Sequence, residues 1–312
     1  MLIGNNRGIV MKIAVCFFGH LRTFKKCAPH IKTNLINRYD CDLFMHTWST
    51  YNHHTKTHHE NTEIKGIVKE SEIIDTYGEF KSIKIEEQVV QDLGNVKVST
   101  KNKRVSLYGV EVSMFGLYSM YHSMKNSFSL CKEYASKNNI QYDMVVMIRP
   151  DIVLLDPLDI ELYESCAPED TLDKSLFTFA KGLSEVNIRY YNLGGNDLMF
   201  FGKLPVIESI MNGSIQELKR IESSLEVTMP EHIIFNIANQ QKLDTYIINY
   251  PGWTLIRPMS FKSKLSRIVR FKLHRNFLKI EFLVFILYKL FSIRLSIGNF
   301  EINICAGRPY SD

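Results

Sequence analysis

Short runs of apolar, β-forming residues recur along this chain, and helix-forming segments separate them. Residues 13–18 (IAVCFF) and 144–148 (MVVMI) are the clearest runs, and residues 42–48 (DLFMHTW) form another. Such runs are typical of buried strands. The order strand, helix, strand favours a parallel arrangement of the strands. We therefore predict an α/β fold in which helices flank the sheet.

The most regular helical pattern covers residues 111–137, where apolar residues recur at steps of three and four and no proline intervenes. A proline near the first turn favours a further helix from Pro230. The remaining predicted elements are helices over 21–37, 204–211, 215–223 and 230–239, and strands over 177–179, 198–201 and the first part of the segment 244–258.

Length, cysteine spacing and absent motifs narrow the classes of protein to which this chain can belong. The chain has 312 residues, 45% of them hydrophobic, which is enough for a sizeable core. None of the six cysteines forms a C-x-x-C pair, so we predict reduced thiols and a cytoplasmic protein. No P-loop, G-x-G-x-x-G or G-x-S-x-G motif is present, which argues against ATP-driven work, dinucleotide redox chemistry and serine hydrolysis. We predict a disordered extension over 1–10, a catalytic domain over 11–259 and a basic amphipathic C-terminal region over 260–312.

Polar residues follow several predicted strands. Gly19 and Arg22 follow the first strand, and Arg149 and Asp151 follow the strand over 144–148. Asp197 precedes another strand after a double glycine. Ligands of open α/β sheets bind at the carboxyl ends of strands, and a carboxylate beside an arginine suits a metal–diphosphate site. The alternatives are a structural salt bridge in a turn for Arg149 and Asp151, a helix-start arginine at Arg22 and a turn aspartate at Asp197.

Other candidate residues lie later in the chain or in a histidine-rich stretch. Glu231, at the start of a predicted helix, would act as a catalytic base or only complement the helix dipole. Arg257 follows Trp253, a pair that suits sugar stacking and phosphate binding, or else anchors a loop. His46 lies near the end of its predicted strand and would face the site. Four more histidines match no zinc-ligand spacing, which favours a solvated loop: His53, His54, His58 and His59.

The segment 260–296 concentrates positive charge. It holds nine Lys or Arg residues and one acid, Glu281, a net charge of +8 against +5 for the whole chain. Its apolar residues fit one helical face, and its longest apolar run is too short to span a bilayer. We therefore predict a basic amphipathic helical tail that lies on an anionic membrane surface. The alternatives are a packed helix pair or a nucleic-acid patch. Since no nucleic-acid-binding motif accompanies the charge, we predict no nucleic-acid partner.

Several segments together resemble a family. "IAVCFFGHLRTF…YDCDLFMHTWS" resembles the opening of bacterial glycosyltransferase-like proteins from capsule and lipopolysaccharide loci, and "YDMVVMIRPDIVLLDPL" is similar to their R-x-D strand end. "GGNDLMFFG" and "PEHIIFNIANQ" resemble their later, acceptor-side segments, so the similarity covers roughly residues 11–260. It implies a Rossmann-like GT-A-type mixed sheet, a nucleotide-sugar donor, and a surface glycan or lipid-linked glycan as acceptor.

The resemblance also implies roles for single residues. Gly19, Arg22, Arg149 and Arg257 would contact the donor, and Asp151 would hold Mn²⁺ or Mg²⁺ or bind the donor ribose. The family's D-x-D motif has two acids where this chain has one, which puts the metal in question.

Either Asp197 or Glu231 would accept the acceptor's proton if the reaction inverts. The enzyme would lie on the inner face of the cytoplasmic membrane. The alternative functions are transfer of a phosphoryl-type decoration onto surface glycan and a non-catalytic scaffold in a glycan-assembly complex.

Overall fold

The computed structural model describes residues 11–52, 66–88, 104–107, 110–180, 197–224, 230–250, 252–256, 293–297 and 300–306. Its strands are β1 (Lys12–Phe18), β2 (Asp40–Trp48), β3 (Ser82–Glu86), β4 (Arg104–Leu107), β5 (Val110–Ser113), β6 (Met144–Ile148), β7 (Ile152–Leu154), β8 (Ser175–Ala180), β9 (Met199–Gly202), β10 (Asp244–Asn249), β11 (Trp253–Leu255), β12 (Ile293–Ile297) and β13 (Phe300–Ala306). Its helices are α1 (Phe24–Asn34), η1 (Ile36–Arg38), α2 (Glu70–Tyr77), α4 (Met114–Asn138), α5 (Ile160–Glu164), η3 (Glu169–Lys174), α7 (Leu204–Ser224) and α8 (Pro230–Gln240).

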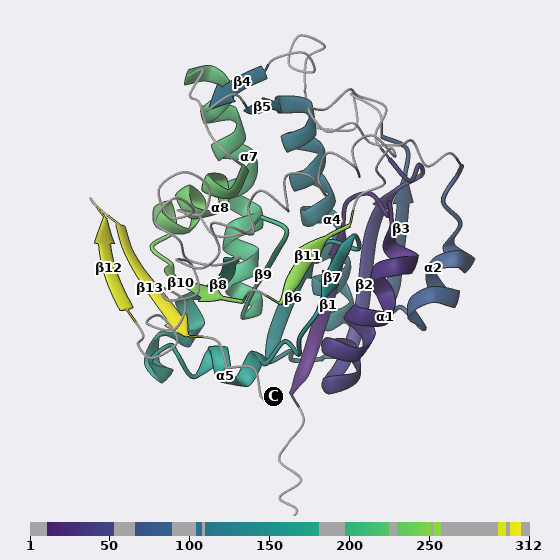
Figure 1. Ribbon diagram of the computed structural model, residues 1–312, viewed down its shortest axis with the longest axis horizontal. Helices are drawn as coiled ribbons and strands as arrows, with labels where there is room; N and C mark the ends of the chain where they lie inside the picture. Colours follow the sequence, from purple (N-terminus) through teal and green to yellow (C-terminus); the bar gives the residue numbers. More distant parts are fainter. Residues whose placement is uncertain are drawn as a thin grey trace, which may run out of the picture.

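Nine of the described strands form one mixed sheet in the order β12-β13-β10-β8-β9-β6-β1-β2-β3 (Figure 1). β9 is antiparallel to both of its neighbours and β12 is antiparallel to β13, so the other seven strands run one way. β1 lies between β2 and β6 and is parallel to both. The predicted α/β class, with a mixed sheet flanked by helices, is confirmed.

The side chains of β1 point alternately into two hydrophobic cores, one on each face of the sheet. Ile13, Val15 and Phe17 belong to the core that contains α1, whereas Ala14 and Cys16 belong to the core built with α4, α7 and α8. Because both faces are covered, β1 has no polar face, which is why its sequence shows an uninterrupted apolar run. The sheet thus holds the ends of β1 and β6 side by side between two layers.

One long helix, α7, replaces the two helices predicted over 204–211 and 215–223. Gly213 lies inside it, where a Cβ atom would come within 2.7 Å of Ile237 Cγ2 on α8. The glycine therefore permits close approach of the two helices and does not end the first one. The prediction of a break was wrong because a glycine can serve packing as well as a turn.

The predicted helical tail is corrected at its end. Residues 293–297 and 300–306 form β12 and β13, and β13 pairs with β10 in parallel. Backbone pairing at the sheet edge (Figure 1, yellow) thus determines the conformation of this segment, and its apolar residues alternate with polar ones as a strand requires. The rest of the basic segment, residues 260–292, lies outside the described residues. No helix in the described part of the chain is long and apolar enough to cross a bilayer.

Candidate functional site

Three residues far apart in sequence meet where β1 and β6 end. Arg22 follows β1, and Arg149 and Asp151 follow β6. Arg149 donates from Nε to Asp151 Oδ1 (2.9 Å) and from Nη2 to Oδ2 (2.6 Å), a bidentate pair. Arg22 Nη1 donates to the same Oδ2 at 2.9 Å. The predicted convergence of these three side chains, hereafter the Arg–Asp–Arg cluster, is therefore confirmed.

The Arg–Asp–Arg cluster is buried. The Asp151 side chain is 0% exposed, and those of Arg22 and Arg149 are 9% and 11% exposed. Its formal charge is +1, from two arginines and one carboxylate. Burial alone would raise the pKa of Asp151, but the charges of Arg149 and Arg22 outweigh burial and hold that pKa below its usual range. Asp151 is thus ionised and fixes the orientation of both guanidinium groups.

The backbone holds Arg22 in an unusual conformation. Its φ is +45°, in the left-handed region that non-glycine residues rarely adopt. The Arg22 N–H donates to Tyr51 O at 3.1 Å, which helps to fix the turn after β1. The buried Nε of Arg22 has no hydrogen-bond partner in the described structure. Strained backbone and unmet buried donors are concentrated at functional sites, so Arg22 is a candidate for ligand contact.

A divalent cation does not fit at Asp151 as it is placed here. Both carboxylate oxygens already accept hydrogen bonds from guanidinium groups. A Mg²⁺ or Mn²⁺ ion needs oxygen ligands at about 2.1 Å, which would bring it against two positive charges. The described geometry instead favours a site in which the two arginines, and not a metal ion, supply the positive charge for an anionic ligand.

Asp197 lies at the same edge of the sheet. Ile148 is paired with Met199, and the Arg149 N–H donates to Leu198 O at 3.0 Å, so Asp197 comes directly beside the cluster's strand end. Asp197 is buried, with 6% of the residue exposed. Its predicted place among the strand-end polar groups is therefore supported by the register of β6 and β9.

Of the remaining predicted site residues, the structure describes Gly19 fully, but it does not describe the side chains of Glu231 and Arg257. Gly19 directly follows β1 with φ +90°, and its N–H donates to Ser123 Oγ on α4 at 2.7 Å. Glu231 lies in the first turn of α8, but its side chain is outside the described part, as is Arg257. The preceding residue, Ile256, donates its N–H to Asp151 O at 3.1 Å.

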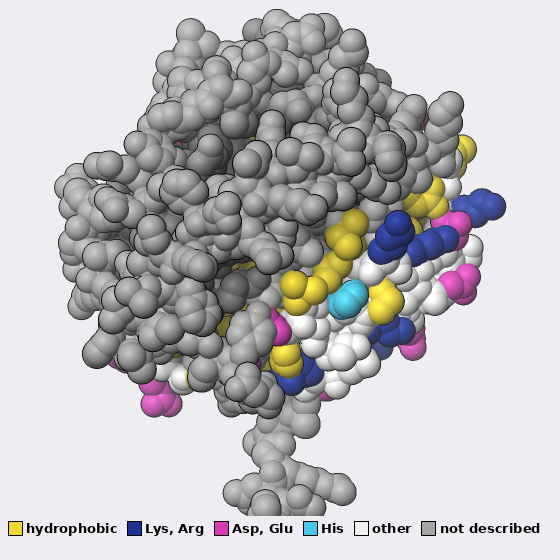
Figure 2. All heavy atoms as spheres, in the orientation of Figure 1, with side chains coloured by type: hydrophobic (Ala, Val, Ile, Leu, Met, Phe, Trp, Pro, Cys, Tyr) yellow, Lys and Arg dark blue, Asp and Glu magenta, His cyan; other side chains and the backbone are white. Residues whose placement is uncertain are grey.

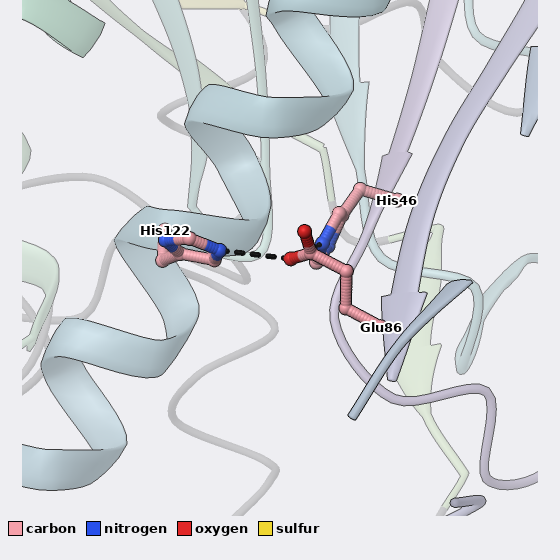
Figure 3. A group of neighbouring side chains, drawn as sticks. All are labelled: His46, Glu86 and His122. Carbon is pink, nitrogen blue, oxygen red and sulfur yellow. Dashed lines mark hydrogen bonds and ion pairs between the residues drawn. The ribbon is translucent and has the colours of Figure 1, made fainter. Parts of the chain in front are cut away.

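A second polar cluster joins β2, β3 and α4 on the face of the sheet that α4 covers (Figure 3). Glu86 Oε2 lies 2.8 Å from His46 Nε2 and 3.0 Å from His122 Nε2. These three ligand atoms all lie within 4.8 Å of one another. His46 is fully buried, whereas the side chains of Glu86 and His122 are 26% and 23% exposed. This is the part of the chain where described side chains could hold a metal.

Only one member of this cluster is predicted from the sequence. The pattern predicts that His46 faces a site, whereas no pattern identifies Glu86 or His122. Glu86 ends a weakly alternating strand and His122 lies in the middle of α4, so neither follows a recognisable motif. The four histidines His53, His54, His58 and His59 lie outside the described residues.

Burial and hydrogen bonding set the protonation states of the cluster. Burial lowers the pKa of His46 to about 4, despite the opposing effect of Glu86. Burial would raise the pKa of Glu86, but hydrogen bonds from Lys84, His122 and His46 lower it to about 2. At neutral pH the cluster therefore presents a neutral buried imidazole beside an ionised carboxylate.

A shallow cleft of about 460 Å³ lies elsewhere, along the outer side of α1. Its lining residues are Lys25, Pro29, Lys32, Thr33, Asn37 and Thr76. The described part of the face in Figure 2 carries Lys and Arg side chains beside acidic ones and shows no patch of a single sign. None of the residues that line this cleft is buried, in contrast to the Arg–Asp–Arg cluster at the strand ends.

No protein-family model matches the chain, and no curated protein sequence is significantly similar to it.

Proposed function

We propose that this protein is a glycosyltransferase that moves a sugar from a nucleotide-diphosphate donor to a surface glycan acceptor, such as a capsule or lipopolysaccharide chain. The observation that carries the proposal is the Arg–Asp–Arg cluster at the carboxyl ends of β1 and β6. In open α/β sheets these ends border the ligand crevice. The mixed sheet, with β9 antiparallel between β6 and β8, is compatible with a GT-A-type fold.

The cluster supplies what a departing nucleoside diphosphate requires. Negative charge accumulates on the diphosphate as the glycosidic bond breaks, and fixed positive groups stabilise it. Guanidinium groups match phosphate oxygens geometrically. Asp151 would act as a positioning residue that holds Arg22 and Arg149 in place. The Nε atom of Arg22, which has no hydrogen-bond partner in the described structure, would donate to the ligand.

The acceptor side of the reaction needs a base. Asp197 is the stronger candidate, because β-sheet register places it beside Arg149. For an inverting reaction it would accept the proton of the acceptor hydroxyl as that oxygen attacks the sugar carbon. Glu231 is the second candidate.

A panel of nucleotides tests the proposal. Purified protein is heated with UDP, GDP, CMP, ADP or no nucleotide, and the corresponding nucleotide sugars are assayed for released nucleotide. One nucleotide is expected to raise the melting temperature by several degrees at about 100 times its Kd. Arg22→Ala is expected to remove the shift, and Arg38→Ala, an exposed arginine on η1, to keep it. A chain that shows no shift and releases no nucleotide would favour the scaffold alternative.

We further propose that the basic segment 260–296 holds the enzyme on an anionic membrane, as its net charge of +8 supports. Deleting the segment together with the chain end would remove β12 and β13, so substitution is the better test. Replacing five basic residues with glutamine is expected to weaken binding to phosphatidylserine vesicles by at least about 100-fold, because each contributes roughly 1 kcal/mol near such a surface. These residues are Lys262, Lys264, Arg267, Arg270 and Lys272.

The control for that experiment removes the same charge from the described surface. Its five substitutions to glutamine fall on exposed residues: Lys26, Arg38, Lys69, Lys137 and Lys219. Vesicle co-sedimentation measures both variants. Equal losses of binding would mean that net charge alone matters, and would remove the segment from the proposal.

A further inference from the structure

We propose that His46, Glu86 and His122 form a binding site for a first-row divalent transition-metal ion, with Zn²⁺ and Co²⁺ as the ions that suit it best. The site shares no residue with the Arg–Asp–Arg cluster and does not rest on the proposed function. Its ligands come from three elements, β2, β3 and α4, that only the folded chain brings together (Figure 3).

The spacing of the ligand atoms matches a metal's coordination shell. Two ligands at about 2.1 Å from an ion lie about 3.0 Å apart at a right angle and about 3.4 Å apart at a tetrahedral angle. The observed separations, 2.8 Å from Glu86 Oε2 to His46 Nε2 and 3.0 Å to His122 Nε2, are close to the first value. The ligand nitrogen atoms of the two histidines lie no more than 4.8 Å apart, so modest movements of these side chains would let one ion contact all three ligands.

The surrounding residues fix both imidazole rings. Ser123 Oγ lies 2.8 Å from His46 Nδ1 and also receives the N–H of Gly19, so His46 presents Nε2 to the site. The Trp48 ring stacks on His122, with centroids 5.6 Å apart and planes 19° apart. Support of this kind orients ligands before the metal arrives and strengthens its binding.

The electrostatics favour a transition metal over Mg²⁺. Lys84 Nζ lies 2.5 Å from Glu86 Oε1, which leaves Oε2 as a single carboxylate ligand. With two imidazoles and one oxygen, the ligand set suits zinc or cobalt, whereas Mg²⁺ prefers oxygen ligands alone. Three protein ligands at a partly exposed site leave coordination positions for water or another ligand.

The competing possibility is a network that needs no metal, in which both imidazoles donate N–H groups to Glu86. Titration with Co²⁺ distinguishes the two, because ligand-field bands report inner-sphere coordination directly. Four of the eight other histidines lie close together in the sequence and could chelate metal, so the titration uses a full-length variant with His53, His54, His58 and His59 replaced by serine. We expect one Co²⁺ ion per chain, displaced by Zn²⁺.

Single substitutions then assign the ion to the site. His122→Ala and Glu86→Gln are each expected to weaken binding by at least about 100-fold, more than the loss of a supporting residue causes. His30→Ala, an exposed histidine on α1, is the matched control and should bind like its parent. Circular dichroism of the metal-free variants verifies folding. The proposal is overturned if no bands appear, or if the His30 variant loses as much affinity as the other two.

Discussion

Replacing Asp151 with alanine is expected to lower the free energy of unfolding by about 3–5 kcal/mol, the cost of removing one partner from a buried ion cluster. The substitution leaves Arg22 and Arg149 buried together with no counter-charge. Urea denaturation of the full chain, followed by tryptophan fluorescence, measures the change. Glu79→Ala is the control, because Glu79 forms only an exposed pair with Lys81 and its loss should barely move the midpoint.

The effect of Asp151→Ala on stability should also depend on pH. The pKa of Asp151 is lower in the folded protein than in the unfolded chain, where it is about 3.9. Its ionisation therefore stabilises the fold above about pH 4, and this contribution is lost as the pH falls through the lower, folded-state value. The stability difference between the wild type and Asp151→Ala should narrow below about pH 4. A difference that is small and independent of pH would show that the cluster contributes little.

For the proposed reaction, replacing Arg22 with alanine is expected to reduce kcat for sugar transfer by about 10²–10³-fold, the usual loss when one preorganised donor to a developing charge is removed. Stability should change less than in Asp151→Ala, since Arg149 keeps its bidentate pair with Asp151. This separation of activity from folding makes Arg22 the better probe of the site.

Two further variants sharpen the Arg22 experiment. Arg22→Lys keeps the charge but loses the planar fork, so it should recover only part of the rate. Arg38→Ala should match the wild type. Initial rates of nucleotide release, with the donor found in the binding panel, measure all of them. An Arg22→Ala enzyme with full activity would remove the cluster from the donor site.

The central strands of the fold were predictable from the sequence, because their local β-forming residues and their burial on both faces of the sheet give the same apolar pattern. The apolar runs of β1, β2 and β6 are buried on both faces and fall within a residue or two of their predicted bounds. Since parallel strands end at one edge, the meeting of Arg22 with Asp151 followed from strand order.

Other features depend on contacts that sequence periodicity does not encode. The antiparallel insertion of β9 and the helix that continues through Gly213 arise from neighbours distant in the chain. His122 likewise occupies an ordinary helical position. Only its contact with Glu86, which is distant in the sequence, marks it as part of a polar cluster. The strand at 293–297 was missed because its basic and apolar residues also fit a helical face.

The placement of β1 between β2 and β6 has a consequence for synthesis of the chain. Val15 pairs with Leu43 on one side, but its partner on the other side, Val146, is made much later. At about 5–20 residues per second, the ribosome needs roughly 6–25 s to travel that far. During this interval an apolar strand edge stays open to other chains, a condition that invites aggregation. High contact order of this kind also slows folding, so a chaperone that shields nascent chains should improve the yield of this protein.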